Sequence, residues 1–242
     1  MTPGNLQERI ALVRSRIAEA ASRAGRNAGD VTVVAVTKGV DAARIREAWA
    51  LRLEDFGENR VQEARIKAPE VGIDARWHMI GHLQTNKVKY VPGLFSLVHS
   101  LDRIDLAREM QKAGDRAGVS IAALVQVNIS GELTKSGVPP CEVISLMHAL
   151  RPYDRIVVRG LMTIAPACDD PEETRPVFSR LHEIAGQVGQ EGIDRVEMKY
   201  LSMGMSQDFV VAVQEGANMV RIGTAIFGPR NYGDAAGKVS RL

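Results

Sequence analysis

The sequence has few cysteines, only Cys141 and Cys168 in 242 residues. Their spacing matches no zinc motif and they cannot build a multi-bridge framework, so a reducing compartment is the simplest setting. Long apolar runs are also missing, because no stretch approaches the roughly 18 residues that a membrane span needs. Charged residues interrupt the N-terminal stretch, which excludes a secretory signal. We therefore expect a soluble, cytoplasmic protein with no membrane partner.

An excess of charge of one sign is absent as well. The 31 basic and 29 acidic residues are interspersed and leave a formal net charge of +2. Since nucleic-acid binding usually needs a basic cluster or stripe, we expect no nucleic-acid partner. The 45% of hydrophobic residues is ordinary for a globular protein and sufficient for one large core.

The first segment has the pattern of an amphipathic helix. Leu6, Ile10, Val13 and Ile17 recur at three- and four-residue spacing and form one apolar stripe, which ends before Gly25. We predict that residues 1–25 form an extra N-terminal helix that covers one end or side of the following domain.

The rest of the chain alternates β-branched runs with charged, helical patterns. The predicted strands are 31–37, 53–56, 76–80, 94–99, 122–128, 156–162, 195–201 and 219–222. The predicted helices include 42–50, 58–68, 102–117, 141–150, 171–188 and 207–214. Strict alternation implies parallel strands with right-handed crossovers, and eight units most economically close into a (β/α)8 TIM barrel. An open doubly wound sheet is the alternative. No linker divides the chain, so we expect one domain over residues 1–242.

Lys38 follows the first predicted strand directly. Functional groups of these barrels lie where the strands end, so its amine is expected at the barrel mouth. Burial there favours the neutral amine, which is the form that attacks an aldehyde. A lysine whose charge merely reaches solvent is the alternative interpretation.

The last two predicted strands end in segments typical of a phosphate site. Ser202, Met203 and Ser206 lie in the first, within Ser-Met-Gly-Met-Ser, and Gly223 with Thr224 lie in the second. Each segment offers a glycine, backbone N–H groups and a hydroxyl, which suit an anion. Phosphate in these barrels is frequently held by the loops after strands seven and eight.

An imine-forming lysine beside a phosphate site predicts pyridoxal 5′-phosphate (PLP), held as a Schiff base on Lys38. Arg221 then faces the pyridine nitrogen and leaves it unprotonated, which makes the ring a weak electron sink. This favours holding the cofactor, or racemase-type chemistry at most. A phosphosugar enzyme with a lysine Schiff base would share the same residues.

Two further strand ends are polar. Asn59 is predicted to line the cofactor site, whereas Glu58 is equally well explained as an acid at a helix N-terminus. His78 is predicted to hydrogen-bond near the cofactor or within the core. His82 lies four residues further on, but Gly81 interrupts any helix and no metal motif is present, so we predict no metal site.

Two other lysines are weighed beside Lys38, and Lys199 is the one that competes with it as the imine lysine. Lys135 lies in a polar loop after the fifth predicted strand and is interpreted either as a second PLP contact or as a solvated lysine. Lys199 lies inside the seventh predicted strand, followed by two more strand residues, and is less well placed.

Together these motifs resemble the pyridoxal phosphate homeostasis proteins, whose barrel is like the N-terminal domain of alanine racemase. The resemblance spans nearly the whole chain, and its motifs are residues 34–38, 56–59, 61–63, 77–78, 80–81, 83–84, 160–162, 201–206, Asp208 and 220–228. It implies PLP on Lys38, no catalytic turnover, and a role in buffering PLP and delivering it to apo PLP enzymes, with effects on amino-acid and keto-acid balance. The sequence departs from the family at Arg60, usually tyrosine, and at Met79, often phenylalanine.

The rival hypothesis is a PLP-dependent racemase or related lyase. Two-base racemisation needs a second acid/base group, which alanine racemase takes as a tyrosine from a C-terminal domain. Only 14 residues follow Gly228, and none of Tyr90, Tyr153, Tyr200 and Tyr232 is an obvious second base. We therefore favour a carrier without catalytic residues, and we expect a monomer.

Overall fold

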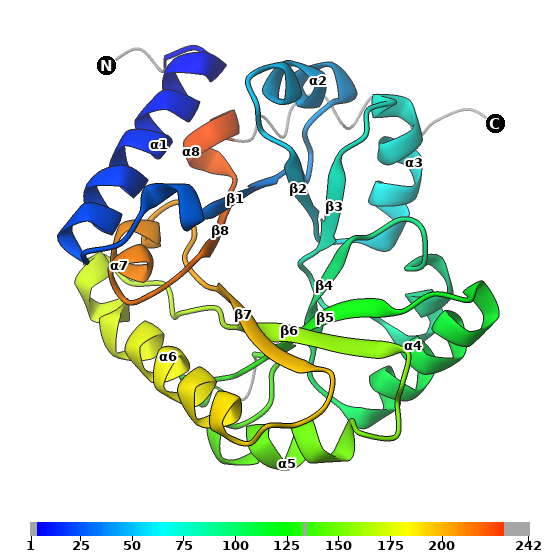
Figure 1. Ribbon diagram of the computed structural model, residues 1–242. Coiled ribbons are helices and arrows are strands. Elements are labelled where there is room, and N and C mark those ends of the chain that lie inside the picture. Colours follow the sequence, from blue (N-terminus) through cyan, green and yellow to red (C-terminus); the bar gives the residue numbers. More distant parts are fainter. Residues whose placement is uncertain (1–3, 133–134, 230–242) are drawn as a thin grey trace.

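Eight parallel strands form a closed barrel in the computed structural model, which describes residues 4–132 and 135–229 (Figure 1). They follow one another around the barrel in chain order, and the last pairs with the first. The (β/α)8 prediction is thus confirmed, and the open sheet is wrong. The strands are β1 (Thr32–Val36), β2 (Asp55–Glu58), β3 (Arg76–Met79), β4 (Leu97–Leu101), β5 (Ile121–Gln126), β6 (Ile156–Met162), β7 (Val196–Ser202) and β8 (Met219–Ile222).

Helices surround these strands (Figure 1). In α4, for example, Leu106, Met110 and Ala113 are buried on one face, and Gly118 ends the helix in the left-handed conformation. A 3₁₀ segment, Thr85–Tyr90, stands between β3 and β4. The helices are α1 (Leu6–Arg23), α2 (Ala42–Ala50), α3 (Val61–Val71), α4 (Ile104–Ala117), α5 (Val143–Ala149), α6 (Arg175–Gln190), α7 (Phe209–Gln214) and α8 (Thr224–Phe227).

Helix α1 is the extra N-terminal helix that the sequence predicts. Asn5 and Glu8 form a capping box at its start. Its apolar stripe packs along the side of the barrel against α7 and α8 (Figure 1). Beyond its end, the Arg26 guanidinium donates to the carbonyl oxygens of Val213 and Ala217 at 2.7 and 2.9 Å. Helix α1 therefore rests on α7 and α8, which lie near the other end of the described residues.

The strand boundaries differ most from the prediction in β2 and β4. Strand β2 continues to Glu58, and β4 lies at 97–101 instead of 94–99. Glu58 is therefore a strand residue, fully buried, and not an acid at a helix N-terminus. Among the described residues, no helix is both long and apolar enough to cross a membrane.

Side chains alternate between the barrel interior and the helix layer, as the period of two requires. Val34, Leu97, Leu124, Met162 and Met219 form a small apolar cluster apart from the larger core, which includes the helices. The same alternation turns the residues at the strand ends toward the barrel axis. The candidate site therefore lies at the ends of the strands, around the barrel axis.

Candidate functional site

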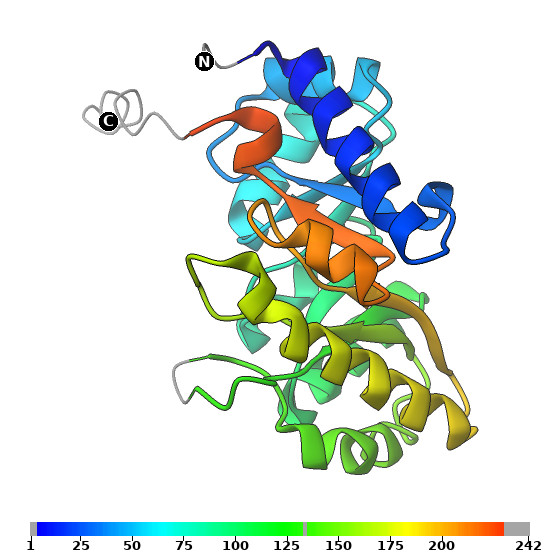
Figure 2. The same ribbon diagram turned by 90° about the vertical axis from the view of Figure 1, so that its left-hand side faces the viewer.

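A pocket of about 750 Å³ opens at the carboxyl ends of the strands, within the roughly 300–1,000 Å³ of small-molecule sites. Lys38, Arg221 and Thr224 line it. An adjoining hollow of about 350 Å³ shares Lys38 and Arg221 and adds Asn59. The segments after β5 and β6 project from this same end of the barrel as α8 does (Figure 2).

Lys38 is positioned by buried contacts of the residue before it. The Thr37 hydroxyl donates to Glu58 Oε1 at 2.7 Å. Lys67, from α3, donates through Nζ to the Thr37 carbonyl at 2.7 Å and to Glu58 Oε1 at 2.5 Å. Burial of the Glu58 carboxyl raises its pKa, although Lys67 opposes the shift. An ion pair between β2 and α3 therefore anchors the end of β1.

Arg221 is held rigidly on the opposite side of the β1–β8 seam. Nη1 donates to the carbonyl and hydroxyl oxygens of Ser202 at 2.8 and 2.6 Å, and Nη2 donates to the Thr163 carbonyl at 2.8 Å. Burial lowers the pKa of Arg221 to about 10, opposed by Asp208, so the guanidinium stays charged at neutral pH. Within the described residues its Nε makes no hydrogen bond, and Arg221 lines the pocket. Nε is thus a donor available to a ligand.

The segment after β7 forms a tight loop beside the start of α8. Gly204 has a φ of +92°, and a side chain there would press on Ala212 and Phe209. The Met205 N–H donates to Asp208 Oδ1 at 2.5 Å, and the Ala225 N–H donates to the Ser206 hydroxyl oxygen at 3.2 Å. The Ser206 hydroxyl hydrogen remains able to donate to an anion.

Removing the Asp208 carboxylate should loosen this loop. We expect Asp208→Ala to lower the free energy of unfolding by about 1–2 kcal/mol, because the part-buried Met205 N–H loses its acceptor. Asp208→Asn keeps an acceptor oxygen and should lose less than half as much. Urea unfolding followed by circular dichroism measures both. Equal losses would show that the charge opposite Arg221, and not the loop hydrogen bond, is the stabilising contact.

The structure brings together six of the nine residues predicted for the cofactor site. Ser202 and Met203 lie behind the pocket instead, where Ser202 contacts Arg221 and Met203 is fully buried. His78 is not at this end: it lines a hollow at the amino-terminal end of the barrel and bonds to Asp55. The six in the pocket are Lys38, Asn59, Ser206, Arg221, Gly223 and Thr224.

Other residues of the site were not predicted. Ile164 and Asp208 line the pocket after β6 and β7, and Thr163 supplies a carbonyl acceptor to Arg221. Lys67 lies inside a charged helix, where nothing in the sequence separates it from solvated lysines. Thr163 and Ile164 directly follow a strand, and this position is the signal that could have identified them.

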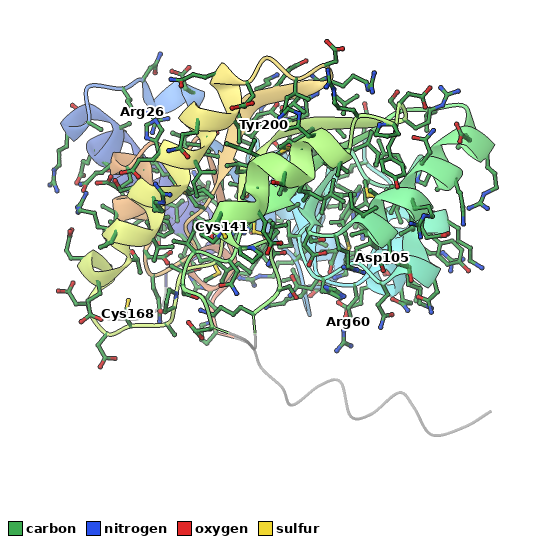
Figure 3. The ribbon with its side chains drawn as sticks, turned by 90° about the horizontal axis from the view of Figure 1, so that it is seen from below. Arg26, Arg60, Asp105, Cys141, Cys168 and Tyr200 are labelled. Carbon is green, nitrogen blue, oxygen red and sulfur yellow. The ribbon has the colours of Figure 1, made fainter. Side chains whose placement is uncertain are left out.

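The competing lysines occupy different ends of the barrel. Lys135 lines the pocket, with its ammonium 2.8 Å from Glu132 Oε1. Lys199 lines the hollow at the amino-terminal end, beside Tyr200. Figure 3 shows Tyr200 at the opposite end of the molecule from Arg60 and Cys168. No cluster of three or more potential metal ligands occurs in residues 4–132 and 135–229.

Comparison with known proteins identifies the family of this barrel. The family model described as alanine racemase, N-terminal domain, matches residues 10–231. The pyridoxal phosphate homeostasis protein of Aquifex aeolicus is 43% identical over 94% of this chain and 100% of its own length, and that of Escherichia coli K12 is 37% identical over 94% and 98%. PipY of Synechococcus elongatus, solved with PLP bound, has a TM-score of 0.81 and 34% identity, covering 93% of this chain and 100% of its own.

The fold and pocket define a barrel of the alanine racemase N-terminal-domain class. Alanine racemase of Clostridium difficile, 16% identical with a TM-score of 0.72, shares that fold over 95% of this chain and 58% of its own. Within this class, the chain belongs to the pyridoxal phosphate homeostasis protein family. The two departures from the family, Arg60 and Met79, do not line the hollows that contain Lys38.

Proposed function

We propose that this protein binds PLP reversibly through Lys38 and serves in PLP homeostasis, as a store that releases the cofactor to apo enzymes. The observation that supports this best is one pocket in which an amine (Lys38), an available guanidinium donor (Arg221) and a loop with free hydroxyl donors lie together. The solved PipY structure with PLP bound, at 34% identity, supports the same assignment.

Each group of PLP has a matching residue in the pocket. When bound, the cofactor supplies an aldehyde that forms an imine with an amine. Lys38 provides that amine at the end of β1. Ser206, Gly223 and Thr224 would hold the phosphate through hydroxyl and backbone donors. Arg221 would donate from Nε to the ring nitrogen, and because it stays protonated at neutral pH it would leave that nitrogen without a proton.

The alternative is a PLP-dependent racemase or lyase. A two-base mechanism needs a second proton-transferring side chain facing the pocket. Of the tyrosines in the described residues, Tyr90, Tyr153 and Tyr200, none lines it, and Tyr232 lies outside the described residues. His82 and Lys135 do line the adjoining hollow. We propose that His82 and Lys135 contact ligands and do not support turnover. We also propose that the protein is a single-domain monomer and acts in the cytoplasm.

Spectroscopy and transfer kinetics test this function. Protein purified without added cofactor should absorb in the near-visible, and borohydride reduction with peptide mapping should place a phosphopyridoxyl group on Lys38. Holo-protein mixed with an apo PLP enzyme should restore that enzyme's activity, with free PLP at the same concentration as the control. A colourless protein, or steady racemisation of an amino acid at enzyme-like rates, would contradict the proposal.

A further inference from the structure

An unbroken series of hydrogen bonds runs through the barrel interior, from its amino-terminal end to Arg221. Asp55 Oδ1 lies 2.9 Å from His78 Nε2, and His78 Nδ1 lies 3.0 Å from His99 Nε2. His99 Nδ1 lies 3.0 Å from the Ser202 hydroxyl, which in turn accepts from Arg221 at 2.6 Å. We call Asp55, His78, His99 and Ser202 the interior relay. It links four neighbouring or facing strands, β2, β3, β4 and β7.

The relay residues are buried where a barrel normally packs apolar side chains. Asp55 and His78 are 7% and 3% exposed, and His99 and Ser202 are fully buried. Polar groups in such a place are costly unless each finds a partner. Every nitrogen and oxygen at the contacts above has one. The hydrogen bonds of the interior relay can therefore all form only if, at each contact, one atom carries the proton and the other accepts it.

The carboxylate at the outer end is fixed in its charged form. Burial opposes ionisation, but hydrogen bonds from Arg76 and His78 prevail and lower the pKa of Asp55 to about 2. Arg76 donates from Nε and Nη2 to the two carboxylate oxygens, each at 2.8 Å. A carboxylate can only accept, so His78 must present Nε2–H to it.

The direction of the remaining hydrogen bonds follows from the groups at the two ends of the relay. His99 is fully buried between His78 and Arg221, and its pKa is lowered well below the ordinary value, chiefly by burial and also by the charge of Arg221. Arg221 can only donate, so the Ser202 hydroxyl hydrogen needs His99 Nδ1 as its acceptor. The proton of a neutral His99 ring then lies on Nε2 and is donated to His78 Nδ1, which leaves Nε2–H as the one N–H of His78. Ser202 thereby presents only lone pairs to Arg221. With the opposite polarity, the buried hydroxyl hydrogen would lack the acceptor that His99 now provides.

We propose that the interior relay acts as a positioning device, in which Asp55 sets the tautomers of His78 and His99 so that Ser202 holds the Arg221 guanidinium and leaves its Nε aimed into the cofactor pocket. A hydroxyl that donates to one partner accepts more strongly from another, so the bond to Arg221 gains from the whole series. The outer end of the relay borders a hollow of about 390 Å³ lined by Asp55, Arg76, His78 and Lys199. Contacts made at the amino-terminal end of the barrel thus reach the ring-nitrogen donor.

The first test needs no cofactor. Long-range ¹H–¹⁵N spectra of the apo-protein report the tautomer of each imidazole, and single His78→Gln and His99→Gln variants assign the signals. We expect neutral Nε2–H forms for both rings in the wild type. Asp55→Leu removes the acceptor and should move both rings away from the single Nε2–H form, whereas Glu54→Gln should not, since Glu54 also contacts Arg76 but lies outside the relay. An Nδ1–H form of His99 in the wild type, or unchanged rings in Asp55→Leu, would overturn the proposal.

The second test rests on the proposed function, because PLP is the reporter at Arg221. Asp55→Leu and Ser202→Ala should each weaken PLP binding about tenfold, in proportion to one lost hydrogen bond to a charged group. Glu54→Gln should bind as the wild type does. Because both changes act through one series, the double variant should bind no more weakly than Ser202→Ala alone, and additive losses would refute the coupling. A wild type that binds no PLP would refute the proposed function, and the tautomer spectra would still decide the relay.

Discussion

Replacing Lys38 by alanine should abolish covalent capture of PLP. The wild type is expected to give a stoichiometric borohydride-stable label and a near-visible absorption band, and Lys38→Ala should show neither. The reason is chemical: within the pocket, Lys38 is the amine that the Thr37, Glu58 and Lys67 contacts place at the end of β1. Residual binding through the phosphate loop should appear only as non-covalent PLP that gel filtration removes. Mass spectrometry after reduction measures the label.

Two matched variants make this result specific. Lys199→Ala removes the other candidate amine, which lies at the opposite end of the barrel, and should keep the full label. Lys135→Ala removes an ammonium from the pocket itself, where it pairs with Glu132, and should also keep the label on Lys38. A label that persists in Lys38→Ala and disappears in either of the others would move the imine site to that lysine.

Replacing Lys67 by methionine should destabilise the fold by about 3–5 kcal/mol at neutral pH, the range found when one partner of a buried ion pair is removed. Glu58 is fully buried and the Lys67 side chain is only 13% exposed, so the carboxylate would be left without its counter-charge. Its second oxygen already has no hydrogen-bond partner in the described residues. Urea denaturation monitored by circular dichroism gives the free energy of unfolding.

The loss should shrink as the pH falls. Burial raises the pKa of Glu58 above its ordinary 4.5 and Lys67 lowers it, so removing Lys67 raises this pKa further. A carboxyl whose pKa is raised in the folded state favours folding when protonated, and that advantage disappears as the pH rises through the folded-state pKa. The difference from wild type should therefore be smaller at pH 5 than at pH 7.

Controls separate charge from packing in this experiment. The double variant Glu58→Gln/Lys67→Met removes both charges and should be more stable than Lys67→Met alone. Lys112→Met breaks an exposed pair with Glu109 and should change stability by less than about 0.5 kcal/mol. If Lys67→Met lost no more than Lys112→Met, or lost equally at both pH values, the Glu58–Lys67 pair would not anchor β1.

Strand-end positions explain why much of the pocket was predictable. Lys38, Arg221 and Thr224 each lie at or near the end of a short β-branched run, and the closed order of strands then brings the first and last together. The alternation of strands and helices already implied this barrel geometry. The resemblance to the pyridoxal phosphate homeostasis proteins made the prediction of the cofactor site more specific. Boundaries were less certain because β2 is only Asp55–Glu58, and a buried acid there resembles a helix-starting acid.

The interior polar residues were not predictable in the same way. His99 lies in a strand whose residues are all buried, so the alternation that separates inward from outward positions is invisible there. His78 was assigned a choice between cofactor and core, and its partners Asp55 and His99 lie 23 and 21 residues away. Such pairs are set by strand register, which the sequence of one chain does not display.

The packing position of α1 determines when this helix can dock during synthesis. Its Arg26 end bonds to carbonyl oxygens 187 and 191 residues further along the chain, and its stripe packs on α7 and α8. Helix α1 therefore has no docking surface until α7 and α8 have been made. Contacts of such long sequence separation form slowly. Closure of the β1–β8 seam, which also assembles the pocket between Lys38 and Arg221, is thus a late step in folding during synthesis.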